Sequence, residues 1–203
     1  MSETDASPRR PRGAYAKGIA RRQEILDRAI EVFAARGADR TSLRAIAAAV
    51  GVTHAALTHH FGSLEQLLVE VYQESARRLE REAADPADLS PVEVMRRSAE
   101  RNRAVPGLVQ LYTALVASAI EDGHPAATPF ATDRFADVRA RLAARLVRMQ
   151  SDGRVRADVD PEQAAALIIA ASDGLQVQWL LDPTVDQVGA LAMLDLLLTR
   201  VPR

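Results

Sequence analysis

The chain has 203 residues, of which 48% are hydrophobic, and its 26 Lys and Arg nearly balance its 27 Asp and Glu. This composition supplies enough apolar surface for a packed core, so it excludes extensive disorder. The chain contains no cysteine, which excludes disulfides, thiol nucleophiles and Cys-ligated zinc or iron–sulfur sites.

Residues 1–17 are polar, basic and contain proline, and they lack the apolar segment of a secretory signal. We expect them to form a flexible basic arm. The sequence also lacks a run of about eighteen consecutive apolar residues, so we expect no membrane partner and a cytoplasmic protein.

Beyond the arm, apolar residues recur at three- and four-residue spacing, and strand-like alternation is hard to find. Helix starts are marked at Ser90-Pro91 and Asp160-Pro161, where a capping side chain precedes a proline. The pattern therefore predicts an all-α protein with about nine helices. Their approximate ranges are 18–36, 42–50, 53–60, 63–81, 90–103, 106–121, 129–150, 160–181 and 185–199.

Residues 41–68 carry the most informative pattern, TSLRAIAAAVGVTHAALTHHFGSLEQLL. Two short helices around a tight Gly51-Val52 turn, preceded by an apolar helix, predict a helix-turn-helix over 42–61. Leu57 and Phe61 would pack the second short helix against the core. The opposite face of that helix would then be free to enter a major groove.

That face carries small or hydrogen-bonding side chains at Thr53, His54, Ala55, Thr58 and His59. Ala and Thr methyl groups suit thymine methyls, and His can donate to guanine or to phosphate oxygens. A merely exposed face without a ligand is one alternative, and a metal site is another. The spacing of His54 and His59 is poor for a shared metal ion, so we predict no metal and no cofactor.

Three segments together resemble the DNA-binding domain of the tetracycline-repressor (TetR) family of transcriptional regulators. They are RRQEILDRAIEVFAARG, then T-S-L-R-x-I-A, then G-V-T-H-x-x-L-x-H-H-F-x-S-x-E-x-L-L. The resemblance implies an all-helical homodimer, a palindromic double-stranded operator and a small-molecule effector. It divides the chain into a DNA-binding domain, 18–80, and a ligand-binding and dimerisation domain, 81–203.

The resemblance places Ser42 and Arg44 near phosphates. It assigns the recognition-helix positions to Thr53, His54, Ala55, Ala56, Thr58, His59 and His60. Family members often carry a phosphate-contacting Tyr where this chain has Thr58, and a Lys where it has Leu64. The arm basic residues Arg9, Arg10, Arg12 and Lys17 would compensate by reaching phosphates or the minor groove, or else form a solvated tail.

The last two predicted helices are apolar on two faces, so each needs two packing partners. One partner is the rest of the domain, and the other is the same helix pair of a second subunit. The run GLQVQWLLDP at 174–183 also resembles the regulatory domain of the TetR family. The expected interface residues are Leu175, Gln178, Val188, Leu191, Leu194 and Leu198.

The helices between residues 63 and 150 should enclose a ligand pocket. The candidate lining residues are Asn102, Tyr112, Phe135 and Trp179, although each of them could instead simply pack in the core. Aromatic residues are only 4% of the chain, which favours an aliphatic or compact ligand over a flat polyaromatic one. His124, in the turn Gly123-His124-Pro125, is expected to be solvated.

No catalytic motif occurs, and Asp173 and the other carboxylates lack the spacing of a helical di-metal site. The sequence therefore predicts a DNA-binding regulator, most simply a repressor released by a small molecule. A regulator controlled by a protein partner, or an α-helical enzyme, is the alternative. Residues 1–62 carry ten basic and six acidic residues, whereas 63–203 carry sixteen and twenty-one, so only the reading end is formally positive.

Overall fold

The computed structural model describes residues 12–36, 42–82, 86, 88–105 and 107–198. Every regular element in these ranges is an α-helix, which confirms the predicted all-α class. The nine helices of this part of the chain are α1 (Arg12–Arg36), α2 (Leu43–Val50), α3 (His54–Phe61), α4 (Leu64–Glu82), α5 (Pro91–Arg103), α6 (Leu108–Ala119), α7 (Ala127–Ser151), α8 (Pro161–Leu181) and α9 (Gln187–Leu198).

The predicted helix starts at Ser90 and Asp160 are confirmed, because each side chain accepts a hydrogen bond from a free amide of the first turn. Ser90 Oγ accepts from the Glu93 N–H at 3.0 Å, and Asp160 Oδ1 accepts from the Gln163 N–H at 2.9 Å. Pro occupies the first position of both α5 and α8, where no intrahelical amide bond is needed.

Several helix boundaries differ from the sequence prediction, and those of α1 and α9 have a visible cause or consequence. Helix α1 begins at Arg12, inside the segment expected to be an arm, and residues 1–11 of that arm lie outside the described residues. Helix α9 begins later than predicted, at Gln187. Asp182 Oδ1 holds the preceding turn by accepting from the Thr184 amide at 3.0 Å and from the Thr184 hydroxyl at 2.7 Å.

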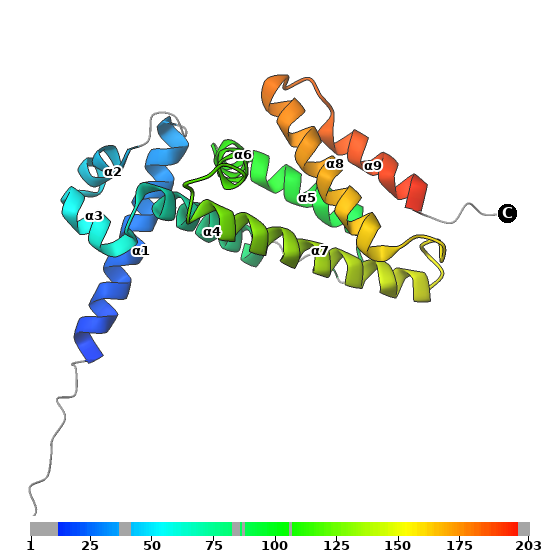
Figure 1. Ribbon diagram of the computed structural model, residues 1–203, viewed down its shortest axis with the longest axis horizontal. Helices are drawn as coiled ribbons and strands as arrows, with labels where there is room; N and C mark the ends of the chain where they lie inside the picture. Colours follow the sequence, from blue (N-terminus) through cyan, green and yellow to red (C-terminus); the bar gives the residue numbers. More distant parts are fainter. Residues whose placement is uncertain (1–11, 37–41, 83–85, 87, 106, 199–203) are drawn as a thin grey trace, which may run out of the picture.

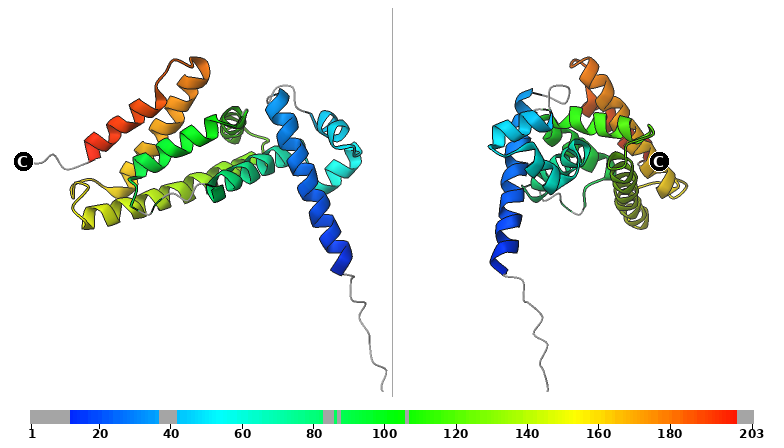
Figure 2. Two further views of the ribbon diagram at one scale, coloured as in Figure 1. Left: turned by 180° about the vertical axis from the view of Figure 1, so that it is seen from behind. Right: turned by 60° about the vertical axis from the view of Figure 1, so that its left-hand side comes forward.

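Helices α1, α2 and α3 gather at one end of the molecule, and α7 extends from α4 toward the other end, where α8 packs against it and α9 packs against α5 and α8 (Figure 1). The view from behind shows the same separation of α1–α3 from the α8–α9 pair (Figure 2). Helix α4 joins the two parts, because it packs against α1 and α3 and also against α6 and α7.

One hydrophobic core runs from the α1–α3 end into the body without interruption. It joins Ile25 of α1, Leu57 of α3 and Leu67 of α4 to Leu111 of α6 and Phe130 of α7. A second core lies between α5, the later part of α7, α8 and α9. A movement of α6 or of the start of α7 therefore acts on the same packed side chains that hold α3.

Helix α8 is the one helix among the described residues that is long and apolar enough to cross a membrane by length and composition. Its packing accounts for much of this character, since Ala165, Ile168 and Ile169 are buried in the second core. Leu167, Val177 and Leu181 are exposed on α8 and need a different explanation.

Candidate nucleic-acid interface and ligand cavity

The turn between α2 and α3 is fixed by two caps and one glycine. Ser42 Oγ accepts from the Ala45 N–H at 3.1 Å, and Thr53 Oγ1 accepts from the Ala56 N–H at 3.1 Å. Gly51 ends α2 with φ of 71°, in the left-handed region where a side chain would be strained. These local choices set the direction in which α3 leaves the turn.

Helix α3 is held by its inner face, where Leu57 is fully buried and Phe61 nearly so. The guanidinium of Arg22 on α1 lies 4.8 Å from the centre of the Phe61 ring, which adds a cation–π contact to the packing. Because the inner face is occupied in this way, the opposite face of α3 points away from the protein.

The outward face carries most of the side chains that the sequence assigned to it. Thr53, His54, Ala55, Thr58 and His59 are exposed, as are Ser42 and Arg44 at the start of α2. Ala56 and His60 are half-buried, and the His60 ring lies 5.7 Å from that of His59. Leu64, where the family often has Lys, packs against the first core instead.

The hydroxyl groups on this surface differ in what they can still donate. Ser42 and Thr53 use an oxygen lone pair for their caps, so their hydroxyl hydrogens stay available for a phosphate oxygen. Thr58 Oγ1 donates to the His54 carbonyl at 3.1 Å, so it offers its methyl group and an acceptor. Among the described residues, no group of three His, Cys, Asp or Glu could hold a metal ion.

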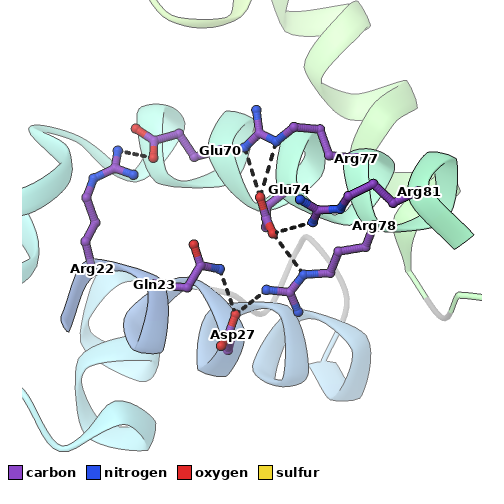
Figure 3. Close-up of polar contacts among 8 residues, drawn as sticks. All are labelled: Arg22, Gln23, Asp27, Glu70, Glu74, Arg77, Arg78 and Arg81. Atoms are coloured by element: carbon purple, nitrogen blue, oxygen red, sulfur yellow. Dashed lines mark hydrogen bonds and ion pairs between the residues drawn. The ribbon is translucent and has the colours of Figure 1, made fainter. Parts of the chain in front are cut away.

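An ion-pair network ties α1 of the reading end to α4 (Figure 3). Arg78 binds both Asp27 of α1 and Glu74 of α4, and the Arg78–Glu74 bond is 3.0 Å long. Arg77 and Arg81 also contact Glu74. Burial acts to raise the pKa of Glu74, but the hydrogen bonds from Arg78 and Arg77 outweigh it, so the pKa is lowered.

A second tie was not predicted from the sequence. His124, expected to be solvated, is half-buried, and its Nδ1 lies 2.6 Å from Glu65 Oε1 in the first turn of α4. Glu65 Oε2 also accepts from the Ala126 N–H at 2.9 Å. One carboxylate next to the recognition helix therefore holds the loop between α6 and α7.

Two adjoining cavities lie along α7. The first, of about 200 Å³, opens between α4 and α7, and the second, of about 280 Å³, lies between α5, α7 and the end of α4. They share four lining residues, Glu80, Arg134, Val138 and Arg141. The remaining lining residues of the second cavity are Val94, Met95, Ser98, Arg101, Leu142 and Arg145.

The sequence suggested four residues for a ligand pocket, and none of them belongs to the lining of either cavity. They are Asn102, Tyr112, Phe135 and Trp179. Phe135 packs between the two hydrophobic cores. The half-buried Trp179 lies under the guanidinium of Arg103, which is 4.7 Å from the centre of the indole ring. Asn102 is half-buried, and its main-chain carbonyl accepts from the Val105 N–H at 3.2 Å.

Tyr112 belongs to a buried cluster that borders the cavities. Its ring stacks on Tyr72 of α4 with centres 5.3 Å apart, and its hydroxyl donates to Asp173 Oδ2 of α8 at 2.9 Å. The guanidinium of Arg134 lies 4.9 Å from the Tyr112 ring and 5.3 Å from the Tyr72 ring. Burial raises the pKa of Asp173, while the hydrogen bond from Tyr112 and the charge of Arg134 oppose that change.

The predicted interface residues do not all face outward. Leu191 is fully buried in the second core, and Leu175, Leu194 and Leu198 pack partly against that core. Val188 is half-buried and Gln178 is exposed. The prediction for Leu191 was wrong, because both faces of α9 are apolar and its periodicity cannot distinguish the inner one.

Comparison with known proteins agrees with this arrangement. Residues 25–71 match the model of bacterial regulatory proteins of the tetR family, and residues 92–202 match that of the C-terminal domain of BetI-type transcriptional repressors. The transcriptional repressor AcnR of Corynebacterium efficiens is 29% identical over 92% of this chain and 95% of its own length.

Two solved structures share the fold and also have more than a quarter of their aligned residues identical to those of this chain. The SmeT–triclosan complex has a TM-score of 0.67 and 26% identity, over 89% of this chain and 92% of that one. The multidrug-binding protein EbrR with proflavin has a TM-score of 0.61 and 31% identity, over 88% and 99%. The chain therefore belongs to the tetR family of bacterial regulatory proteins and is a helix-turn-helix transcriptional regulator.

Proposed function

We propose that this protein is a repressor that binds a palindromic operator as a homodimer and is released from it by a small molecule. The exposed outer face of α3 is the observation that carries the proposal. On a helix in the major groove, the exposed Thr53, His54, Ala55 and His59 would meet base edges, and Ser42 and Arg44 would lie beside the phosphate backbone.

Gel-shift binding to DNA that flanks the gene tests this role for α3. The double variant His54→Ala with His59→Ala should lose sequence-specific binding, because each lost base contact costs about 1–3 kcal/mol. The double variant Arg139→Ala with Ser151→Ala, at two exposed positions of α7, is the matched control and should keep specific binding. Unchanged binding by the histidine double variant would contradict the assignment of the recognition helix.

The proposed dimer forms through a seam of exposed residues on α8. Leu167, Ala170, Gly174, Val177 and Leu181 recur at alternating three- and four-residue spacing, and all of them are exposed. Such spacing is typical of helices that pack together at a small angle. Met193, Leu196 and Leu197 extend the exposed apolar surface onto α9, which suits a four-helix interface between two subunits.

Gly174 is a second observation that supports packing of two α8 helices at this seam. A glycine in the middle of a helix costs about 1 kcal/mol relative to alanine, yet a Cβ at Gly174 would meet nothing within 4 Å in its own chain. The neighbours of one subunit therefore do not explain the glycine. Close approach of a second α8 does, because it would leave no room for a side chain there.

In the proposed mechanism, a ligand bound in the C-terminal domain of each subunit changes the distance between the two DNA-binding domains, here called the reading heads. Two half-sites lie about one DNA turn apart, so both recognition helices must keep that separation to bind together. Triclosan with SmeT and proflavin with EbrR are examples of small molecules bound by similar proteins. The ligand can shift this equilibrium only by its difference in affinity for the two conformations.

The proposal places residues 18–80 in the reading domain and 81–203 in the ligand-binding and dimerisation domain, acting in the cytoplasm. The basic residues before and at the start of α1, Arg9, Arg10, Arg12 and Lys17, would add phosphate contacts. The proposal contains no catalytic step. Asp173, the carboxylate that an enzyme in this body would most simply use, already accepts a hydrogen bond from Tyr112 and lies near Arg134.

A further inference from the structure

Resting on the proposed release by a small molecule, we infer that the effector is an organic anion, a carboxylate on a compact aliphatic body. It binds in the cavity between α5, α7 and the end of α4, with Arg134 and Arg141 facing its charge. Val94, Met95 and Leu142 line the same cavity and would receive the aliphatic part.

The charge of the lining favours an anion. Four arginines and a single carboxylate, that of Glu80, line the second cavity. Glu80 Oε1 lies 4.0 Å from Arg141 Nη1, at the limit of an ion pair, so it neutralises this wall only weakly. An Arg guanidinium recognises a carboxylate through two parallel hydrogen bonds, which gives direction as well as strength.

The arrangement of the neighbouring aromatic rings disfavours a cationic ligand. Tyr72 and Tyr112 are the rings on which a quaternary ammonium group could be held by cation–π contacts. In this chain Arg134 already occupies that position, with its guanidinium 5.3 Å and 4.9 Å from the two ring centres. A cationic ligand would have to displace Arg134 and would be repelled by it at close range.

The volume of the second cavity limits the size of the anion. At about 280 Å³ the cavity is just below the ~300–1,000 Å³ of sites for drug-sized ligands, which favours a small effector. Arg134 also lines the first cavity and borders the cluster of Tyr72 on α4, Tyr112 on α6 and Asp173 on α8. An anion that draws Arg134 toward itself would alter contacts with the helix that reaches the reading head and with the proposed dimer helix.

The experiment uses the full-length protein and three series of straight-chain probes, from four carbons to about ten. The carboxylates should bind in isothermal titration and raise the melting temperature, because they bind the native state. The neutral amides and the trimethylammonium compounds of the same lengths should not. Arg134→Gln and Arg141→Gln should each weaken carboxylate binding by about tenfold or more. Arg139→Gln, on the same helix, exposed and outside both cavities, should leave it unchanged.

Three results would overturn the inference: equal binding of the amides, binding of the ammonium series, or no binding of any carboxylate. Carboxylate binding that survives both arginine substitutions would place the anion elsewhere and would overturn it too. A gel shift on the same preparations, with no probe present, reports the proposed function separately. If the unsubstituted protein binds no carboxylate but still binds DNA, the result therefore contradicts the anion site alone.

Discussion

His124 Nδ1 lies 2.6 Å from Glu65 Oε1, although the two residues are far apart in the chain and belong to different parts of the molecule. Glu65 stands in the first turn of α4, directly after the recognition helix. His124 stands in the loop that leads into α7, the helix that lines both cavities. The pair is thus a direct polar contact between the loop that leads into α7 and the start of α4, next to the helix-turn-helix.

A double-mutant cycle measures this contact. We expect Glu65→Ala and His124→Ala each to lower the free energy of unfolding by about 1–3 kcal/mol, because hydrogen bonds to a partly buried charge are lost. Their coupling energy should be about 0.5–2 kcal/mol. Glu121→Ala is the control, since Glu121 is exposed and lies 3.9 Å from Nε2 of the same histidine. Additive effects of the first two substitutions would show that the pair is not an energetic link.

The two roles of Thr53 can be separated by substitution. Its hydroxyl caps α3 by accepting from the Ala56 N–H, and the proposal also places it at the DNA. Thr53→Asp should keep the folding stability, because aspartate is an equally good cap. Its negative charge beside the phosphates should nevertheless weaken operator binding by about tenfold or more.

Thr53→Ser is the matched control, because it keeps the cap and adds no charge, so both stability and DNA binding should change little. Urea denaturation and a gel shift on the same preparations give the two measurements. Operator binding by Thr53→Asp at the level of Thr53→Ser would place Thr53 away from the DNA backbone.

The sequence predicts the helices well because each one has a strong local signature, such as the Ser90-Pro91 cap or the buried stripe of Leu57 and Phe61. It does not predict the contacts that close between distant segments. Arg134 meets Tyr72 and Tyr112 only because α4, α6 and α7 pack together, and no local pattern marks that meeting.

The same limit applies to the predicted ligand and dimer residues. Trp179 and Asn102 were chosen by residue type within helices, but the lining of a cavity depends on how α5, α7 and α4 are spaced. Leu191 was assigned to the dimer because α9 is apolar on both sides, and only the fold shows that this side is its own core. The exposed seam is recognisable once the buried face is known.

The seam on α8 gives a prediction about oligomeric state. Val177→Glu should convert the proposed dimer to a monomer in sedimentation velocity, because a charge in an apolar interface loses its hydration without gaining a partner. Val147→Glu is the control, since Val147 is also an exposed valine but lies on α7. If the Val177→Glu protein stays dimeric, α8 does not form the interface.

Gly174→Ala tests the same seam in the opposite sense. Within one subunit the added methyl meets nothing, so alanine should stabilise α8 by about 1 kcal/mol. If two α8 helices meet closely at this position, the methyl group should weaken dimerisation instead. Sedimentation over a range of concentrations distinguishes the two outcomes, and a dimer strengthened by alanine would exclude close approach at Gly174.

Acid should remove a stabilising contribution at the start of α5. Hydrogen bonds from Arg96, at 2.7 Å, and from Arg97, at 2.8 Å, lower the pKa of Glu93 from 4.5 to about 2. Because the folded-state pKa is the lower one, the contribution is complete above pH 4.5 and is lost as the pH falls toward 2. The ion pairs are partly exposed, so Glu93→Gln should lower the free energy of unfolding by only about 0.5–1 kcal/mol at neutral pH.

Urea denaturation measures the free energy of unfolding of both proteins, and the difference between them should shrink as the pH falls. The exposed Glu162→Gln control should stay within about 0.5 kcal/mol of the unsubstituted protein. A difference that grows in acid would mean that the arginines do not favour the charged form of Glu93.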